Sequence, residues 1–368
     1  MKIMVVSPKN KTVFNFRGDL IRDMIDKGHE VIVIGPNQDY VEDVLALGVS
    51  EFIEVKLVKD NTSILGDLEY LKKLISVFQE KKPDLVFGYT IKPVIYGSMA
   101  AKLAGVPHIY AMVTGLGRVY ASGGMKAKIV RLITKMLYKM AFLCCNRVIF
   151  QNGDDIAELV SKHYLPAQKT VQVNGSGVNM ERFQRTALPG QPVFLMVSRV
   201  IREKGVMEYC QAARAVKKSC PDARFILLGG LDASIGALKM EDIQPYIDDG
   251  SIEFPGEVKD PVAFYQKCSV FVLPSYYREG LPRTLLEAMS CGRAIITTDW
   301  PGCREPVEDG ANGYKIPVRD AAALAQRMEI LASNPELTQK MGAAAYETCR
   351  QKYEVSMINA QMRSIIGY

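Results

Sequence analysis

Short runs of β-branched and aliphatic residues alternate with longer amphipathic segments along the first half of this 368-residue chain. Such an alternation favours β-α-β crossovers, which build a parallel sheet covered by helices on both faces. The expected strands read KIMVV, EVIVIG, EFIEV, DLVFGY, HIYAMV, RVIFQ and TVQVN. Segments such as GDLEYLKKLISVFQEK, with apolar residues at helical spacing, are expected to form the helices between them. An α/β fold with a Rossmann-like sheet is therefore predicted for this half.

A proline- and glycine-rich stretch, TALPGQP at 186–192, interrupts the alternation, which restarts at VFLMVS and ends in helices from DAAALAQRMEILA onward. We therefore expect an N-terminal Rossmann-like domain at 1–188 and a C-terminal one at 189–350. Residues 351–368 are expected to form a helix that packs back on the first domain. Open α/β sheets bind ligands at the carboxyl ends of their strands, so two such domains facing each other predict one central cleft.

Composition excludes several classes of function. The net charge is only +6 and the cations are scattered, which disfavours nucleic-acid binding. The three histidines are far apart and no D-x-D occurs, so no metal site is predicted. His108 lies in an expected strand and is interpreted as a core or structural histidine. The eight cysteines form no C-x-x-C pair and are expected to be reduced.

The chain enters its first strand directly and has neither the pattern of a signal peptide nor an apolar run of about 20 residues, the length that spans a bilayer. A cytoplasmic protein is therefore expected.

Two cations follow the first strand of the second half in VSRVIREKGV. Arg199 lies at the end of the strand, and Lys204 lies just before a glycine and a helix. Cations beside a helix N-terminus form an anion site, and a diphosphate is its natural occupant. The alternative is that both are solvated surface cations.

The next motif, LPSYYREGLPRTLLEAMSCG, contains two glutamates. Glu279 lies in the loop after a buried strand, and Pro282 fits the first position of the following helix. The backbone N–H groups of Gly280 and Leu281 are expected to point toward the same space. Glycine at 280 would let the backbone approach a ligand closely.

Glu287 lies inside that helix among apolar residues, where an unpaired carboxylate costs several kcal/mol. Two vicinal ribose hydroxyls would satisfy it. The alternative is a salt bridge to Arg283 or Arg304.

The R-x4-K and E-x7-E motifs together resemble those of GT-B glycosyltransferases of family 4, and the similarity extends over essentially the whole chain, including GVNMERF at 177–183. The resemblance implies that Arg199 and Lys204 act on the diphosphate of the donor. It also implies that Glu287 holds the ribose. Glu279, with the backbone of the two residues after it, would contact the transferred sugar.

The same resemblance points to three residues in the first domain. Gly18 is expected at the start of the first helix, where its N–H would approach the donor phosphates, and Arg17 would face an anionic acceptor. The alternatives are a helix-start glycine without a ligand and a solvated arginine. Thr114 takes the place of a family histidine in HIYAMVTGLGRVY and is an acceptor-side candidate. Family members that extend lipid-diphosphate-linked glycans also carry GLG without the histidine.

The segment 125–145 predicts a basic amphipathic helix, with Lys128, Arg131, Lys135 and Lys139 at helical spacing opposite apolar residues. Such a helix can lie on an anionic bilayer surface. With the resemblance, this favours peripheral attachment to the inner face of the cell membrane. The alternative is a packed crossover helix with a solvated basic face.

The resemblance implies a retaining glycosyltransferase, and the lack of a metal-binding motif predicts that it needs neither a metal nor a cofactor. As the resemblance also implies, it would move a hexose or N-acetylhexosamine from a nucleotide sugar, with UDP as the expected nucleotide, to a lipid-diphosphate-linked acceptor. The resemblance implies a role in surface polysaccharide, O-antigen or glycoprotein glycan assembly. A sugar-nucleotide epimerase of the same architecture and a non-catalytic nucleotide-sugar-binding protein are the alternatives. A dinucleotide-dependent oxidoreductase is disfavoured because no G-x-G-x-x-G follows the first strand.

Overall fold

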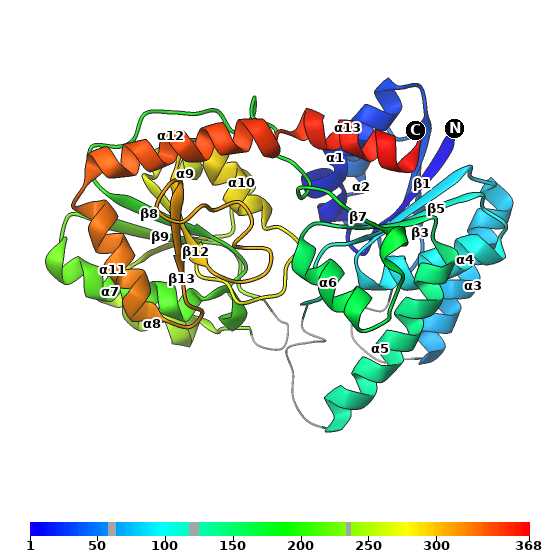
Figure 1. Ribbon diagram of the computed structural model, residues 1–368, viewed down its shortest axis with the longest axis horizontal. Coiled ribbons are helices and arrows are strands. Elements are labelled where there is room, and N and C mark those ends of the chain that lie inside the picture. Colours follow the sequence, from blue (N-terminus) through cyan, green and yellow to red (C-terminus); the bar gives the residue numbers. More distant parts are fainter. Residues whose placement is uncertain (58–63, 118–124, 233–236) are drawn as a thin grey trace. The chain divides into compact units, whose positions relative to one another are not determined.

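The computed structural model describes residues 1–368 except 58–63, 118–124 and 233–236, and it leaves the side chains of 64 and 125–131 undescribed. The chain divides into two compact units (Figure 1). The first consists of Met1–Ser176 together with Ser356–Tyr368, and the second of Gly177–Val355. Each is an α/β unit with a parallel sheet, as the alternation of apolar runs predicted.

The first unit contains a seven-stranded parallel sheet with the order β3-β2-β1-β4-β5-β6-β7. Its strands are β1 (Lys2–Val6), β2 (Glu30–Gly35), β3 (Glu51–Glu54), β4 (Leu85–Tyr89), β5 (His108–Val113), β6 (Arg147–Phe150) and β7 (Thr170–Gln172). The central strands are buried on both faces, which is why they read as continuous apolar runs.

Helices cover both faces of this sheet. They are α1 (Asn10–Asp26), α2 (Val41–Leu45), α3 (Ile64–Lys81), the π-helix η1 (Pro93–Gly97), α4 (Ser98–Leu103), α5 (Met125–Cys144), α6 (Gly153–Ser161), the 3-10 turn η3 (Ala167–Lys169) and α13 (Val355–Ile366). Alternate residues of β1 enter different cores. Ile3 packs with α1, α2 and α13, and Met4 packs with α3, η1, α4, α5 and α6.

Residues 356–368 belong to the first unit although they follow the second in sequence. Arg363 Nη1 donates to both carboxylate oxygens of Asp23 in α1, at 2.5 and 2.6 Å. The hydroxyl of Tyr368 donates to the same carboxylate at 2.8 Å. Ile358, Met362 and Ile366 of α13 are part of the core beneath α1. The C-terminal helix therefore completes one face of the first unit.

The second unit contains a six-stranded parallel sheet with the order β10-β9-β8-β11-β12-β13. Its strands are β8 (Val193–Val197), β9 (Arg224–Leu228), β10 (Glu253–Gly256), β11 (Val270–Leu273), β12 (Ala294–Thr298) and β13 (Gly313–Ile316). Its helices are η4 (Arg202–Lys204), α7 (Val206–Ser219), α8 (Met240–Asp248), α9 (Val262–Lys267), α10 (Arg283–Ser290), α11 (Ala321–Ala332) and α12 (Pro335–Lys352). One continuous apolar core underlies them.

The chain enters the second unit after Ser176, ahead of the proline- and glycine-rich stretch that was expected to divide the domains near residue 188. The reason is that the intervening residues are built into the second unit. Phe183 is fully buried in its core, and its carbonyl accepts a hydrogen bond from Ser290 Oγ at 2.7 Å. Arg293, also fully buried, donates to the carbonyl of Thr186 at 3.0 Å.

Candidate active site

The second unit places the two predicted cations where its strand order reverses. The chain adds β9 and β10 on one side of β8 and then β11, β12 and β13 on the other. Arg199 follows β8, and Lys204 is the last residue of η4. In open α/β sheets ligands bind outside the carboxyl ends of the strands at such a reversal. The loops after β8 and β11 meet there, since Tyr276 N donates to the carbonyl of Glu203 at 2.8 Å.

Lys204 is held by the glycine that follows it. Gly205 has a φ of +77°, and a Cβ at this position would lie 2.1 Å from the carbonyl oxygen of Pro274. Only glycine allows the backbone to pass so close to the end of β11 in this conformation. Lys204 is buried, so it is not the solvated cation of the alternative interpretation. Its Nζ forms an ion pair with Glu279 Oε1, and Ser275 Oγ donates to the same oxygen at 3.3 Å.

Arg199 lies beside an acidic and an aromatic residue. Its Nη1 is 2.9 Å from Asp232 Oδ2, and its guanidinium lies 5.7 Å from the centre of the Tyr277 ring. The ammonium of Lys204 lies 5.9 Å from the same ring centre. Arg199 is exposed, with 47% of its side chain accessible to solvent, as the alternative interpretation allowed. Partial burial disfavours its charged form, but the hydrogen bond to Asp232 and the neighbouring Tyr277 outweigh this and raise the pKa of the guanidinium. Two cations thus share one aromatic ring at the reversal point, an arrangement suited to an oxyanion ligand.

Sequence reasoning missed both Asp232 and Tyr277. Tyr277 lies two residues before Glu279, so its place in the motif was the available signal. Asp232 follows a different strand, β9, and no spacing in the sequence relates it to Arg199. Only the sheet order brings the two together.

Glu287 lies in α10, and its side chain is 13% exposed. Its Oε1 is 3.3 Å from Arg283 Nε, and its Oε2 accepts a hydrogen bond from the Tyr265 hydroxyl at 2.8 Å. Burial raises the pKa of this carboxyl, and Arg283 and Tyr265 oppose the shift. The salt bridge to Arg283 that sequence analysis offered as an alternative is therefore present, whereas Arg304 pairs with Asp299 at 3.4 Å. Contact with a ribose stays a prediction.

The backbone after Glu279 is tightly packed. Gly302 has a φ of +88°, and a Cβ there would lie 2.6 Å from the carbonyl oxygen of Glu279 and 2.9 Å from that of Gly280. Leu281 is buried in the core of the second unit. Pro282 is the N-cap of α10, with an extended ψ of 116°, so it lies one position earlier than predicted. These contacts fix the backbone of the Glu279–Leu281 segment.

Gly18 was predicted to start the first helix, and this prediction is wrong. Helix α1 begins at Asn10, so Gly18 lies in its interior. Interior helical N–H groups are used by carbonyls one turn earlier, so the expected free donor is lost. A Cβ on Gly18 would lie 3.2 Å from Cδ2 of Leu47. The glycine therefore serves the close packing of α1.

Arg17 is buried, which rules out the solvated side chain of the alternative interpretation. Its Nη2 donates to Met112 Sδ at 3.0 Å, and its guanidinium lies 5.0 Å from the centre of the Tyr89 ring. Tyr89 ends β4, and its hydroxyl lies 2.6 Å from Ser7 Oγ, just after β1. Thr114 directly follows β5. Arg17 and Thr114 thus belong to the carboxyl edge of the first sheet, and their contact with an acceptor stays a prediction.

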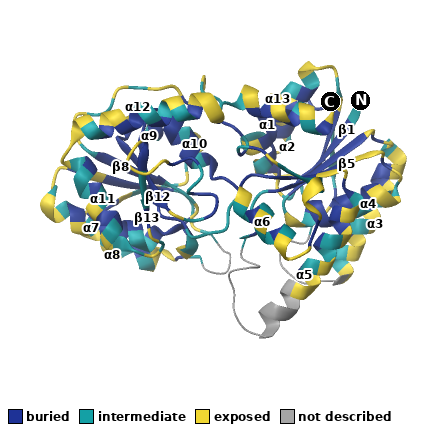
Figure 2. Cartoon of the chain, viewed as in Figure 1, coloured by how far each residue is buried: buried dark blue, intermediate teal, exposed yellow. Residues whose placement is uncertain are grey.

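His108 is the first residue of β5 and is exposed, so the interpretation as a core histidine was wrong. The expected basic amphipathic helix forms as α5, but its exposed side is not only basic. Leu132, Met136 and Met140 are exposed, whereas Tyr138 and Phe142 pack in the core. Figure 2 shows exposed as well as more buried residues along α5. The side chains of Lys128 and Arg131 lie outside the described residues.

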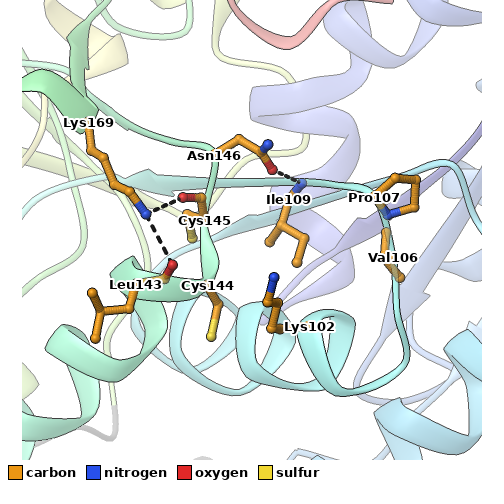
Figure 3. A pocket seen from close by; sticks show the side chains of 9 residues that line it. All are labelled: Lys102, Val106, Pro107, Ile109, Leu143, Cys144, Cys145, Asn146 and Lys169. Carbon is orange, nitrogen blue, oxygen red and sulfur yellow. Dashed lines mark hydrogen bonds between the residues drawn. The ribbon is translucent and has the colours of Figure 1, made fainter.

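One pocket of about 320 Å³ opens at the amino edge of the first sheet, beside the end of α5 (Figure 3). Lys169 Nζ donates there to the carbonyls of Leu143 at 3.0 Å and Cys145 at 2.7 Å, and thereby caps α5. Parallel sheets bind ligands at the opposite edge. We therefore do not assign the active site to this pocket.

Within the residues that the structure describes, no group of three or more His, Cys, Asp or Glu side chains could hold a metal ion. No described helix is long and apolar enough to cross a membrane.

Family matches cover both units. The family described as glycosyl transferases group 1 matches residues 179–348, and the family described as glycosyl transferase 4-like matches residues 2–152. One curated relative is the N,N'-diacetylbacillosaminyl-diphospho-undecaprenol alpha-1,3-N-acetylgalactosaminyltransferase of Campylobacter jejuni, 29% identical over 97% of this chain and 96% of its own length. Another is the UDP-Gal:alpha-D-GlcNAc-diphosphoundecaprenol alpha-1,3-galactosyltransferase of Escherichia coli, 28% identical over 78% and 74%.

Solved structures share the fold. HepE of Anabaena, in complex with UDP and glucose, superposes with a TM-score of 0.80 at 18% identity, over 100% of this chain and 99% of its own. Sucrose-phosphate synthase from Thermosynechococcus elongatus gives a TM-score of 0.82 at 19% identity, over 99% and 98%. With both units matched and the fold shared, the chain belongs to the group 1, family 4-like glycosyltransferases of GT-B fold.

Proposed function

We propose that this glycosyltransferase moves a hexose or N-acetylhexosamine from a UDP-sugar to a lipid-diphosphate-linked glycan, with retention of anomeric configuration and without a metal ion. Two relatives support the acceptor class, since both are named for alpha-1,3 transfer to diphospho-undecaprenol-linked sugars. A neighbour of the same fold, solved with UDP and glucose, supports the donor class. The acceptor in turn implies a role in the assembly of surface polysaccharide, O-antigen or glycoprotein glycans.

The observation that carries the proposal is the pair of cations at the reversal point of the second sheet. Arg199 and Lys204 lie on one tyrosine ring, and each has a carboxylate neighbour, Asp232 or Glu279. A donor diphosphate at this point would replace the carboxylates as the partner of both cations. Charge on the leaving diphosphate grows in the transition state, so preorganised cations would lower the barrier to transfer.

The proposed mechanism needs no protein nucleophile. The leaving diphosphate, held by Arg199 and Lys204, takes the proton of the incoming hydroxyl on the face where the sugar leaves. Glu279 and the backbone after it hold the sugar, and Glu287 holds the ribose. The contacts of Glu287 with Tyr265 and Arg283 fix the position of its carboxylate before the donor binds.

Thermal unfolding with UDP, GDP, ADP and NAD tests donor binding. At about a hundred times its dissociation constant, a ligand adds roughly 2.7 kcal/mol to the stability of the native state. We expect UDP to raise the Tm of the wild-type protein but not that of Arg199→Ala or Glu287→Ala. Arg224→Ala is the matched control, because Arg224 pairs with Glu253 at the other edge of the same sheet. A UDP shift that survives both substitutions contradicts the donor site.

Product analysis separates transfer from the other activities of this architecture. With UDP-sugar and undecaprenyl-diphosphate-linked N-acetylglucosamine, we expect an α-linked product, readable by NMR and unchanged by EDTA. Conversion of the donor without any acceptor would instead show an epimerase. Donor binding without turnover would show a binding protein.

Peripheral attachment to the inner face of the cell membrane is part of the proposal, and exposed apolar side chains support it. They gather on one helical layer of the first unit, formed by α3, η1, α4 and α5. We call it the apolar layer, and its exposed side chains are Leu65, Leu68, Ile91, Leu103, Leu132, Ile133, Met136, Met140 and Leu143. Lys135 and Lys139 accompany them on α5 and would add attraction to anionic lipids.

A further inference from the structure

Lys92 lies in the first unit at the position that corresponds to the loops after β8 and β11 in the second unit. In the first sheet the chain adds β2 and β3 on one side of β1 and then β4 on the other. The reversal point therefore lies between β1 and β4, and Lys92 follows β4 closely. Ligands of open α/β sheets bind at such reversals. A ligand of the first unit is accordingly expected beside the segment 90–93.

This segment has a tightly determined backbone. Thr90 has a φ of +67°, rare for a β-branched residue, and its N–H donates to the carbonyl of Met112 at 3.2 Å. Its carbonyl accepts from Val94 N at 2.9 Å. A Cβ on Gly88 would lie 2.9 Å from the carbonyl oxygen of Pro93, so η1 begins directly against β4. Strained backbone of this kind persists where surrounding contacts hold it, and it clusters at ligand sites.

The side chain of Lys92 is aimed by Asp67, which is held in turn by Tyr96. Its Nζ donates to Asp67 Oδ1 at 2.8 Å, and Asp67 Oδ2 accepts from the Tyr96 hydroxyl at 2.7 Å. The side chains of Lys92 and Asp67 are 20% and 17% exposed, so the ammonium is preorganised but within reach of a ligand. This repeats the pattern of the second unit, where a carboxylate accompanies each phosphate-binding cation.

Apolar side chains border this ion pair. Asp67 lies between Leu65 and Leu68 in α3, and Ile91 directly precedes Lys92; all three apolar residues are exposed members of the apolar layer. In a lipid-linked glycan, the diphosphate joins the prenyl chain to the first sugar. A cation that binds it must therefore lie where a lipid-contacting surface meets the sugar-binding edge of the sheet. Lys92 lies at that border.

We propose that Lys92 binds the diphosphate of the amphiphilic acceptor, held in place by Asp67 and Tyr96. The inference rests on the proposed function for the identity of the acceptor. Because Asp67 is itself anionic, it competes with the phosphate for the ammonium. Removal of the lysine and removal of the carboxylate should therefore change binding in opposite directions.

Vesicle sedimentation in the presence of saturating UDP tests this, because UDP occupies the donor cations. Phosphatidylcholine vesicles would carry either undecaprenyl diphosphate or phosphatidylglycerol at matched charge. We expect Lys92→Met to weaken binding to the undecaprenyl diphosphate vesicles about tenfold and to leave binding to phosphatidylglycerol vesicles unchanged. Asp67→Asn should bind undecaprenyl diphosphate several-fold more tightly than the wild-type protein.

Lys81→Met is the matched control, since Lys81 lies in the same unit and pairs with Glu51 at 2.9 Å, at the amino edge of the sheet. Three outcomes overturn the assignment. The first is that Lys92→Met binds undecaprenyl diphosphate vesicles as tightly as wild type. The second is that Lys92→Met loses equal affinity for both vesicle types. The third is that Lys92→Met and Asp67→Asn lose binding and Tm in parallel, which would show that the ion pair is purely structural. Failure of wild-type protein to bind UDP would instead refute the proposed function, and the vesicle comparison would still report on Lys92.

Discussion

Lys204 and Glu279 form an ion pair across 75 positions of sequence, one following β8 and the other following β11. Both side chains lie largely out of solvent, and Ser275 Oγ adds a hydrogen bond to the carboxylate. The pair joins the two loops at the reversal point of the sheet. A ligand that takes Lys204 must therefore also reorganise Glu279. In the proposed function this would couple the phosphate end of the donor to its sugar end.

Replacement of Arg199 should slow transfer as well as weaken donor binding. We expect Arg199→Ala to lower kcat by roughly 10²–10³, about 2.7–4 kcal/mol, by analogy with loss of an oxyanion donor. Arg199→Lys should recover only part of this, because an ammonium lacks the planar fork of the guanidinium. Steady-state kinetics with UDP-sugar measures both. The assignment is wrong if Arg199→Ala turns over like Arg224→Ala.

Glu287 should make stability depend on pH. Its pKa is raised by burial, so the folded state holds the proton more tightly than the unfolded state does. Stability is then lost as pH rises from the unfolded pKa through the folded one. Glu287→Gln removes this titration, so the stability of the variant relative to wild type should increase over that pH range. Urea unfolding at a series of pH values measures it, and a pH-independent difference would contradict the raised pKa.

Gly205→Ala should damage both stability and donor binding. The left-handed conformation alone costs an alanine about 1–2 kcal/mol, and the added Cβ would also meet the carbonyl of Pro274. Gly250→Ala is the control, because Gly250 has a similar φ of +72° and open space around it. Thermal unfolding should show the larger loss for Gly205→Ala, and only this variant should lose the UDP shift. Equal losses would show that the close approach to Pro274 is unimportant.

A charge on the apolar layer should release the protein from vesicles. Met136 is exposed on α5, one turn from Leu132 and from Met140, so Met136→Asp places a carboxylate within the stripe. Full burial of a large apolar side chain is worth about 1.5–3 kcal/mol, so its loss should lower partitioning about tenfold or more. Met240→Asp, at an exposed methionine of the second unit, should have no effect. Sedimentation with anionic vesicles at low salt compares the two variants, and equal partitioning would contradict a membrane role for α5.

The sequence was informative where one motif fixes both residue type and position. In the second unit the R-x4-K and E-x7-E motifs resemble those of a known family, and this resemblance predicted that Arg199, Lys204 and Glu279 share a site. The structure brings the three side chains together around Tyr277 and the ion pair of Lys204 with Glu279. Asp232 was out of reach, since its proximity to Arg199 depends on the order of strands in the sheet. A loop residue that belongs to no motif, such as Asp232, cannot be assigned to a site from the sequence alone.

Errors arose where helix boundaries or burial were decided by tertiary packing. Gly18 was expected at a helix start, but α1 extends back to Asn10 because Val13 and its neighbours already pack on the sheet. His108 was expected inside, but it begins its strand and faces solvent. On α5 the sequence left two interpretations open, a membrane-facing helix and a packed crossover helix. Only the observed rotation of the helix shows that Tyr138 and Phe142 take the buried positions, whereas Leu132, Met136 and Met140 stay exposed.

Because residues 356–366 supply part of the core beneath α1, the first unit depends on a segment that the ribosome makes after all of the second unit. During synthesis, Gly177–Val355 can fold from contiguous chain, whereas the earlier half waits with an uncovered apolar face. Nascent chains that stop before Ile358 leave that face open to chaperones and proteases. The two units therefore complete their folding in an order different from the order of their synthesis. Helix α13 is the segment by which chaperones and proteases can distinguish finished from unfinished chains.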